Sequence, residues 1–170
     1  EEKGREQLSF SIDISAESEG WSRVPDLESH VRRAAEAAML DSDAPPSEIS
    51  VVLSDDEHIR ELNKHHRGLD KPTNVLSFPA ARIRTPAGAP RVLGDVVIAY
   101  ETVAREASEE SKAIEHHLSH LVVHGVLHLL GYDHEDEEEA EMMEARERTI
   151  LARLGIPDPY AERGSSAARA

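Results

Sequence analysis

The segment from His124 to His134 constrains the fold of this chain more than any other stretch of it. Residues 112–130 are predicted to form one long helix, in which His124 and His128 project from the same face, one turn from each other. Gly131 predicts the end of this helix, because glycine readily adopts the left-handed conformation that terminates helices. The turn that follows can bring His134 back beside the other two histidines. The chain must then fold with three imidazoles around one point.

Three imidazoles in this arrangement indicate a metal site with an open fourth position, which is typical of a catalytic zinc rather than a structural one. We therefore take His124, His128 and His134 as metal ligands. His120, one turn before His124, is a candidate to support a ligand through hydrogen bonding. The 170 residues include no cysteine, which excludes a disulfide scaffold, a thiolate zinc site and a cysteine nucleophile.

Hydrophobic periodicity divides the chain into strands and helices. Alternating or short apolar runs predict four strands, at residues 8–14, 49–53, 74–78 and 92–100. Helical spacing predicts helices at residues 25–40, 55–68, 101–108, 112–130 and 135–154. This mixture indicates an α+β fold, with a small mixed four-stranded sheet covered by four to five helices and a metal site at the end of the histidine-rich helix. We expect a single domain over residues 1–163 and a disordered tail over residues 164–170.

The charge balance argues against a general affinity for nucleic acid. The chain has 19 basic and 34 acidic residues and a net charge of −15, so its overall field repels polyanions and anionic membranes. One segment reverses this balance, and it carries Arg60, Lys64, Arg67, Lys71, Arg82, Arg84 and Arg91 against Glu61 and Asp70. This basic segment is either a local site for a phosphate-bearing partner or a set of scattered solvated charges.

The hydropathy of the chain predicts no membrane partner. No apolar run reaches the roughly 20 residues that a membrane-spanning helix needs. The first residues also lack the apolar core of a signal peptide. We therefore expect a soluble, cytoplasmic protein.

Residues 124–134 have the histidine and glycine spacing of the metzincin proteases, with one difference. Where that signature has its general-base glutamate, this chain has Gly125. The ligands are thus present without the proteolytic base, which favours a hydrolase that uses metal-bound hydroxide together with cations that stabilise an anionic transition state. Asp95, Asp133 and metal hydroxide alone remain candidates for the general base.

Four motifs follow one another in a set order along the chain. They are LNKHHRG at residues 62–68, KPTNVLSFP at 71–79, LGDVVI at 93–98 and HGVLHLLGYDH at 124–134. Together they resemble the YbeY family of bacterial rRNA maturation factors. The resemblance extends over about residues 49–160.

The resemblance implies a single-strand-specific, metal-dependent endoribonuclease that acts in 16S rRNA 3′-end maturation and ribosome quality control, with one zinc per chain. It implies two catalytic residues, Arg67, whose guanidinium can grip a phosphate with two hydrogen bonds, and His124, which acts through the metal. Single-stranded RNA is expected to lie along the basic segment, where Lys71, Arg82 and Arg84 are the candidate substrate-binding residues. The implied partners are rRNA, the small ribosomal subunit and its assembly factors.

Two other functions stay open. A metalloprotease is supported by the ligand spacing and opposed by Gly125. A non-catalytic ribosome-assembly factor would use its zinc structurally and bind ribosomal protein or RNA with its surface. An exchangeable water position at the metal would argue against this last function.

Overall fold

The computed structural model describes residues 10–42, 47–80 and 91–161. Several of the predictions above lie outside the described residues. They are the first residues of the strand at 8–14, the binding residues Arg82 and Arg84, and the tail at 164–170.

The described residues form one mixed sheet of four strands, as predicted. In spatial order the strands are β1 (Phe10–Ala16), β2 (Ser47–Ser54), β4 (Arg91–Ala99) and β3 (Val75–Pro79). β1, β2 and β4 run parallel, and β3 pairs antiparallel with β4. β3 is therefore an edge strand, whose free side is available to border a site.

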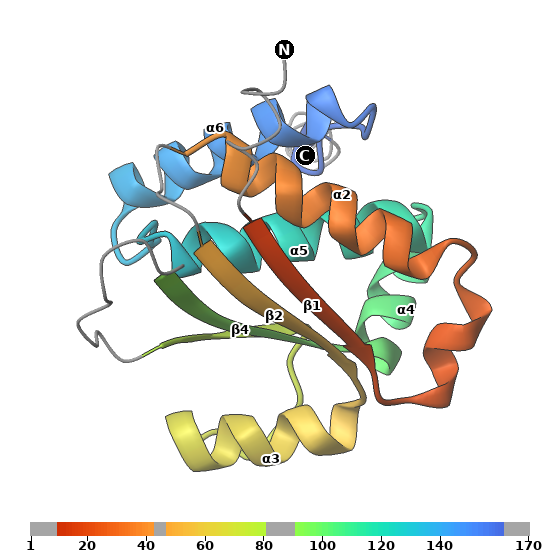
Figure 1. Cartoon of the computed structure of the whole chain (residues 1–170). Helices are drawn as coiled ribbons and strands as arrows, with labels where there is room; N and C mark the ends of the chain where they lie inside the picture. The colour runs from red at the N-terminus through yellow and green to blue at the C-terminus, as the bar shows by residue number, and fades with distance from the viewer. Residues whose placement is uncertain (1–9, 43–46, 81–90, 162–170) are drawn as a thin grey trace, which may run out of the picture.

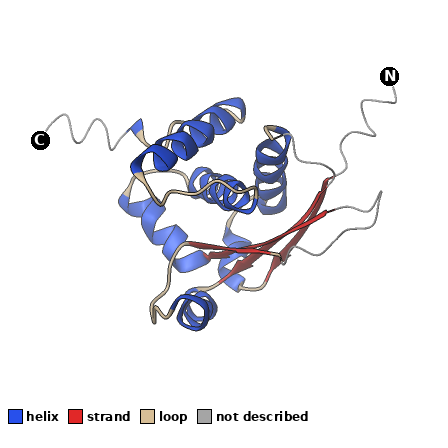
Figure 2. Cartoon of the chain, turned by 90° about the vertical axis from the view of Figure 1, so that its left-hand side faces the viewer, coloured by secondary structure: helices blue, strands red, loops and turns tan. Residues whose placement is uncertain are grey.

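Five α-helices lie in the described part of the chain, which confirms the predicted α+β class. They are α2 (Leu27–Leu40), α3 (Asp56–Arg67), α4 (Tyr100–Glu109), α5 (Ile114–Leu129) and α6 (Glu137–Arg153). Figure 1 shows α2 and α5 on one face of the sheet, α6 farther out on that side, and α3 on the opposite face. Figure 2, turned by 90°, shows the same layers edge-on.

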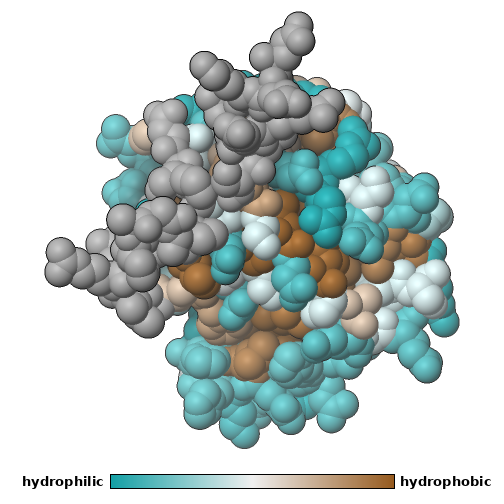
Figure 3. Space-filling model, viewed as in Figure 1, coloured by the Kyte–Doolittle hydropathy of each residue, from teal (hydrophilic) through white to brown (hydrophobic). Residues whose placement is uncertain are grey.

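The two faces of the sheet bury separate clusters of apolar side chains. On the larger side, strand residues such as Val51 and Val96 pack with α2 and α5. The predicted stripe of α2 faces this core, and its residues Val31, Ala34, Ala35 and Ala38 are all buried. On the other side, Ile59 of α3 packs with Leu76 and Val97. Figure 3 shows the resulting surface, with hydrophilic side chains over the outer side of α3 and apolar ones near the centre.

A short 3₁₀ helix, η1 (Glu19–Arg23), was not predicted from the sequence. It places Trp21 in the core with no solvent exposure, where the indole Nε1–H donates a hydrogen bond to the Ser54 carbonyl at 2.9 Å. The indole also packs edge-on against Tyr100, with ring centroids 5.2 Å apart. Tertiary contacts hold this turn in place, and such contacts leave no periodic pattern in the sequence.

Helices α3 and α5 are each followed by a glycine, as predicted. Gly68 follows α3 with φ 71°, and Gly131 follows α5 with φ 108°. Only glycine adopts such backbone angles without steric cost, so each helix stops at a defined residue. The ends of both helices lie near β3, where His66 of α3 packs against Phe78 and Ser77 bonds to Gly125 of α5. Within the described ranges, no helix is long and apolar enough to cross a membrane.

Candidate metal centre

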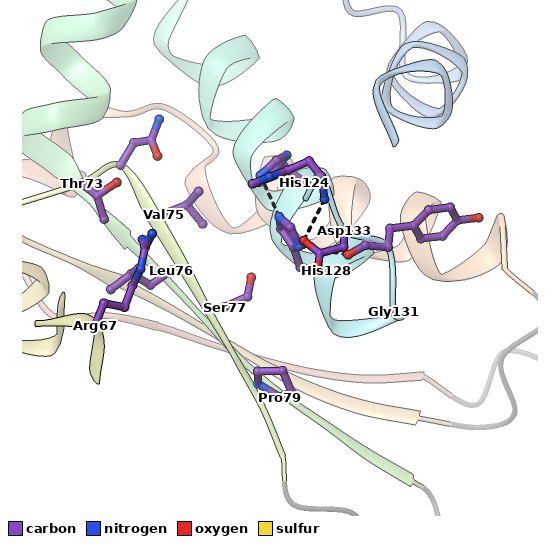
Figure 4. Close-up of a pocket in the computed structure, with 13 residues that line it drawn as sticks. Arg67, Thr73, Val75, Leu76, Ser77, Pro79, His124, His128, Gly131 and Asp133 are labelled. Carbon is purple, nitrogen blue, oxygen red and sulfur yellow. Dashed lines mark hydrogen bonds between the residues drawn. The ribbon is translucent and has the colours of Figure 1, made fainter. Parts of the chain in front are cut away.

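A cavity of about 580 Å³ opens between the edge strand β3 and the C-terminal end of α5 (Figure 4). One wall is formed by β3 and the residues just before it, and the other by the end of α5 and the turn that follows. Arg67, the last residue of α3, also lines this cavity. Residues 67–79 and the end of α5, which are far apart in the sequence, thus meet at one hollow of the surface.

The three predicted ligands converge in this cavity. One potential ligand atom each from His124, His128 and His134 lies within 4.8 Å of the others. The rings of His128 and His134 have centroids 4.9 Å apart, and those of His124 and His128 are 4.6 Å apart. The three histidines therefore lie together, as their helical spacing and the turn after Gly131 predict.

Hydrogen bonds fix which nitrogen of each helical histidine faces the cavity. Nδ1 of His124 lies 2.9 Å from a carboxylate oxygen of Glu147, and Nδ1 of His128 lies 3.0 Å from the Tyr132 carbonyl. Because both oxygens can only accept, each Nδ1 carries the hydrogen and each Nε2 presents a lone pair. Burial lowers the pKa of His128, and the neighbouring histidines lower it further. A neutral imidazole with a free lone pair is the form that binds a metal.

The spacing of these nitrogens fits a tetrahedral metal ion. Nε2 of His124 and Nε2 of His128 are 3.2 Å apart. Two ligands at the usual zinc–nitrogen distance of about 2.0–2.1 Å in tetrahedral geometry are separated by about 3.3 Å. Two lone pairs facing each other at this distance repel unless a cation lies between them. The donor set therefore suits a metal ion.

Glu147 of α6 orients His124 and its helical neighbour His120. Its carboxylate has no solvent exposure and accepts hydrogen bonds from Nδ1 of His124 and from Nε2 of His120. The Tyr160 hydroxyl also donates to it, at 2.6 Å. Burial alone opposes ionisation of Glu147, but the bonds from the two histidines outweigh this and lower its pKa to about 2. The carboxylate is therefore ionised and able to fix the ring of His124.

Sequence reasoning proposed His120 as a supporting residue but missed Glu147 and Tyr160. His120 does act next to His124, although through the shared carboxylate of Glu147 rather than directly. A signal for Glu147 is present in the sequence. The buried residues of α6 include Met143, Glu147, Ile150 and Leu151, so one carboxylate occupies an apolar helical stripe.

Gly125 lies where α5 touches the sheet. A Cβ atom at this position would lie 2.6 Å from Cγ1 of Val96 on β4, closer than packed carbon atoms approach. Ser77 of β3 also donates a hydrogen bond to the Gly125 carbonyl at 3.0 Å. The general-base glutamate of a metzincin protease therefore has no room at this position.

The structure separates the two acidic candidates for the general base. Asp133 lines the cavity, and its Oδ1 accepts a hydrogen bond from the His134 amide at 2.7 Å. Asp95 is on β4 and alternates with Val96, which faces α5, so Asp95 projects from the face of the sheet that α3 covers. Only Asp133 of this pair belongs to the cavity.

The predicted cations reach the cavity to different degrees. Arg67 lines it, and Figure 4 shows its side chain across the hollow from His124 and His128. Lys71 lines a second, adjoining cavity rather than the one with the histidines. Arg82 and Arg84 lie outside the described residues.

Known proteins resemble this chain over most of its length. A family model described as Endoribonuclease YbeY matches residues 13–155. The chain belongs to the YbeY family. A protein named Endoribonuclease YbeY from Rhodopseudomonas palustris is 59% identical over 152 residues, which cover 88% of this chain and 80% of that relative. One of the same name from Bradyrhizobium diazoefficiens is 58% identical over 151 residues, 84% of this chain and 81% of the relative.

A solved structure shares the arrangement of elements. The solution structure of TM1509 from Thermotoga maritima matches with a TM-score of 0.53 and 28% sequence identity. The match covers 84% of this chain and 91% of the other. The YbeY family resemblance expected from the four sequence motifs is thus confirmed over most of the chain.

Proposed function

We propose that this protein is a metal-dependent endoribonuclease that cleaves single-stranded RNA with one zinc ion per chain. The observation that carries the proposal is the convergence of His124, His128 and His134 in a cavity that Arg67 also lines. A hydrolase of phosphodiesters needs a site that activates water and a cation that meets the phosphate. Membership of the YbeY family supports RNA as the substrate.

Zinc is the metal proposed for this site because three neutral imidazoles without a thiolate form a common catalytic zinc site. When bound, zinc supplies a Lewis acid that lowers the pKa of water and polarises a phosphoryl oxygen. His124, His128 and His134 would hold it, and the buried carboxylate of Glu147 supports this ligand set by keeping the Nδ1 proton of His124 in place.

The remaining polar groups of the cavity are assigned to the substrate. Arg67 is proposed to bind the scissile phosphate, since its guanidinium stays charged and can donate two parallel hydrogen bonds. Asp133 is proposed as the proton acceptor, because it is the acidic candidate that lines the cavity. Lys71, Arg82 and Arg84 are proposed to bind the RNA backbone beyond the scissile phosphate.

The proposed biological task is 16S rRNA 3′-end maturation and ribosome quality control, in the cytoplasm and in contact with the small ribosomal subunit and its assembly factors. This part of the proposal rests on the family to which the chain belongs. A net charge of −15 supports local rather than general binding of RNA, because the chain as a whole repels a polyanion.

The deciding experiment is single-turnover cleavage of a single-stranded RNA by highly purified protein. His128→Ala, carried through the same purification, serves as the control for contaminating ribonucleases. We expect chelator-sensitive cleavage by the wild-type protein and none by the variant. Equal cleavage by both proteins would show that the activity does not belong to this site. A zinc-containing protein that binds RNA without cleaving it would favour the assembly-factor alternative.

A further inference from the structure

We infer a second phosphate-binding site next to the metal centre, formed by Lys71 and Arg105 together with the shared Arg67. Its ligand is the phosphodiester that neighbours the scissile one on the same RNA strand. This inference rests on the proposed nuclease function and extends it by one nucleotide. Arg105, on α4, lies outside all four sequence motifs and outside the basic segment.

The site is a distinct cavity of about 350 Å³. Three residues, Arg67, Thr73 and Asn74, line both this cavity and the one that contains the histidines. The two hollows therefore adjoin along the residues just before β3, with Arg67 between them. This arrangement suits consecutive phosphates of one extended strand, because the shared cation can contact both.

The cations of this second cavity are free to bind a ligand. No ion pair joins Arg67, Lys71 or Arg105 to a carboxylate of the described ranges. Neighbouring cations of the basic segment differ, since Arg60 and Lys64 both pair with Asp70. In a chain of net charge −15, three unpaired cations around one hollow concentrate positive potential there.

One carboxylate, that of Glu106, also lines the second cavity, but hydrogen bonds hold it to the wall. Its Oε1 accepts from the Asn74 side chain at 3.0 Å and from Nε2 of His117 at 2.8 Å. Three cations, Arg67, Lys71 and Arg105, line this cavity together with one carboxylate, so positive charge outweighs negative charge there. The cavity therefore favours an anion over a cation or a neutral ligand.

Buried polar residues fix the backbone that carries these cations. The Asn63 side chain, 1% exposed, donates a hydrogen bond to the Lys71 carbonyl at 2.9 Å. On the opposite wall, the buried hydroxyl of Thr102 donates to Asp56 at 2.7 Å, which ties α4 to the start of α3. A phosphate would thus meet a preorganised site, and less conformational entropy would be lost on binding.

The first test is the binding and cleavage of a short single-stranded RNA by Arg105→Ala. Arg33→Ala is the matched control, because Arg33 is an exposed arginine on α2 that lines neither cavity and has no ion pair among the described residues. We expect Arg105→Ala to raise KM and Kd several-fold with kcat and zinc content unchanged. The slope of log K against log salt should decrease by about 0.7, the value for one lost phosphate contact on a single strand.

The second test identifies the phosphate. RNAs in which one linkage at a time is replaced by a neutral methylphosphonate are bound to wild-type protein and to Arg105→Ala. Neutralising the linkage next to the scissile one should weaken binding to the wild-type protein several-fold and weaken binding to the variant clearly less, because only Lys71 and Arg67 still contact that phosphate. If the two losses are instead additive, Arg105 does not contact that phosphate and the inference is wrong.

The outcomes separate this inference from the proposed function. Wild-type protein that cleaves RNA, with Arg105→Ala matching it in Kd and salt slope, would overturn the second site and leave the nuclease intact. Wild-type protein that neither binds nor cleaves RNA would overturn both. Equal losses in Arg105→Ala and Arg33→Ala would show a general effect of charge, which also contradicts a specific site.

Discussion

Oε2 of Glu147 accepts a hydrogen bond of 2.9 Å from Nδ1 of His124, although the two residues lie on different helices. The carboxylate has no solvent exposure, so the bond is not in competition with water. A buried, ionised carboxylate behind a ligand histidine fixes the orientation and the tautomer of the ring. The affinity of the site for metal should therefore depend on a residue that does not touch the metal.

Replacing Glu147→Gln tests this dependence. Glutamine keeps the size of the side chain but loses the charge and one acceptor, so we expect zinc affinity to fall by about 10- to 100-fold, as for comparable supporting residues. Competition with a chromophoric chelator measures the change. Glu141→Gln, an exposed position on the same helix, is the control and should bind zinc as the wild type does. Unchanged affinity in Glu147→Gln would show that His124 needs no such support.

Removing one ligand should nearly empty the site. We expect the purified wild-type protein to contain about one zinc per chain and His128→Ala to lose most of it, because a site with three protein ligands holds the metal poorly with two. Metal analysis of both proteins, prepared in parallel with His30→Ala from α2, measures this. Full zinc content in His128→Ala would mean that the metal is bound elsewhere.

Arg67 should affect the rate of cleavage more than the binding of RNA. If its guanidinium stabilises charge that develops on the phosphate, Arg67→Ala should slow single-turnover cleavage by about a hundredfold or more, with the zinc content unchanged. Arg67→Lys should recover only part of this loss, because an ammonium group keeps the charge but not the paired hydrogen bonds. Cleavage by Arg67→Ala at the wild-type rate would exclude a catalytic role and favour an assembly function.

The close contact between Gly125 and Val96 predicts a loss of stability on adding a single methyl group. Gly125→Ala forces a Cβ to within 2.6 Å of Val96 Cγ1, and such overpacking typically costs about 1–3 kcal/mol. The gain in helix propensity is about 1 kcal/mol and offsets only part of this cost. Denaturant unfolding of the metal-free proteins measures the difference.

The double variant Gly125→Ala/Val96→Ala provides the control for this contact. Because the second substitution removes the clashing methyl groups, the double variant should lose less stability than the sum of the two single changes. Simple additivity would show that the strain lies elsewhere, and a Gly125→Ala protein more stable than the wild type would contradict the contact itself.

Local chemistry was enough to predict that His124, His128 and His134 lie together. His124 and His128 share a helical face because of their spacing alone, and Gly131 ends the helix because its φ of 108° suits glycine. These relationships involve neighbours in sequence, so the backbone geometry of one helix and one turn determines them. The same reasoning explains why the strands and helices were predicted in the right order, and why the buried stripe of α2 was identified.

Contacts between distant elements could not be obtained in this way. Glu147 meets His124 across 23 positions of sequence, and Arg105 comes to line a cavity with Arg67 from a different helix. The order β1-β2-β4-β3 places β3 beside α5, and the packing of α5 on one face of the sheet leaves Asp95 on the other face, away from Asp133. Periodicity tells which side of an element is buried, but not which other element covers it. The grouping of the three histidines was therefore readable in one segment of sequence. The carboxylate of Glu147 and the arginines that line the two cavities depend instead on how the helices pack on the sheet, because only packing brings side chains from distant segments together.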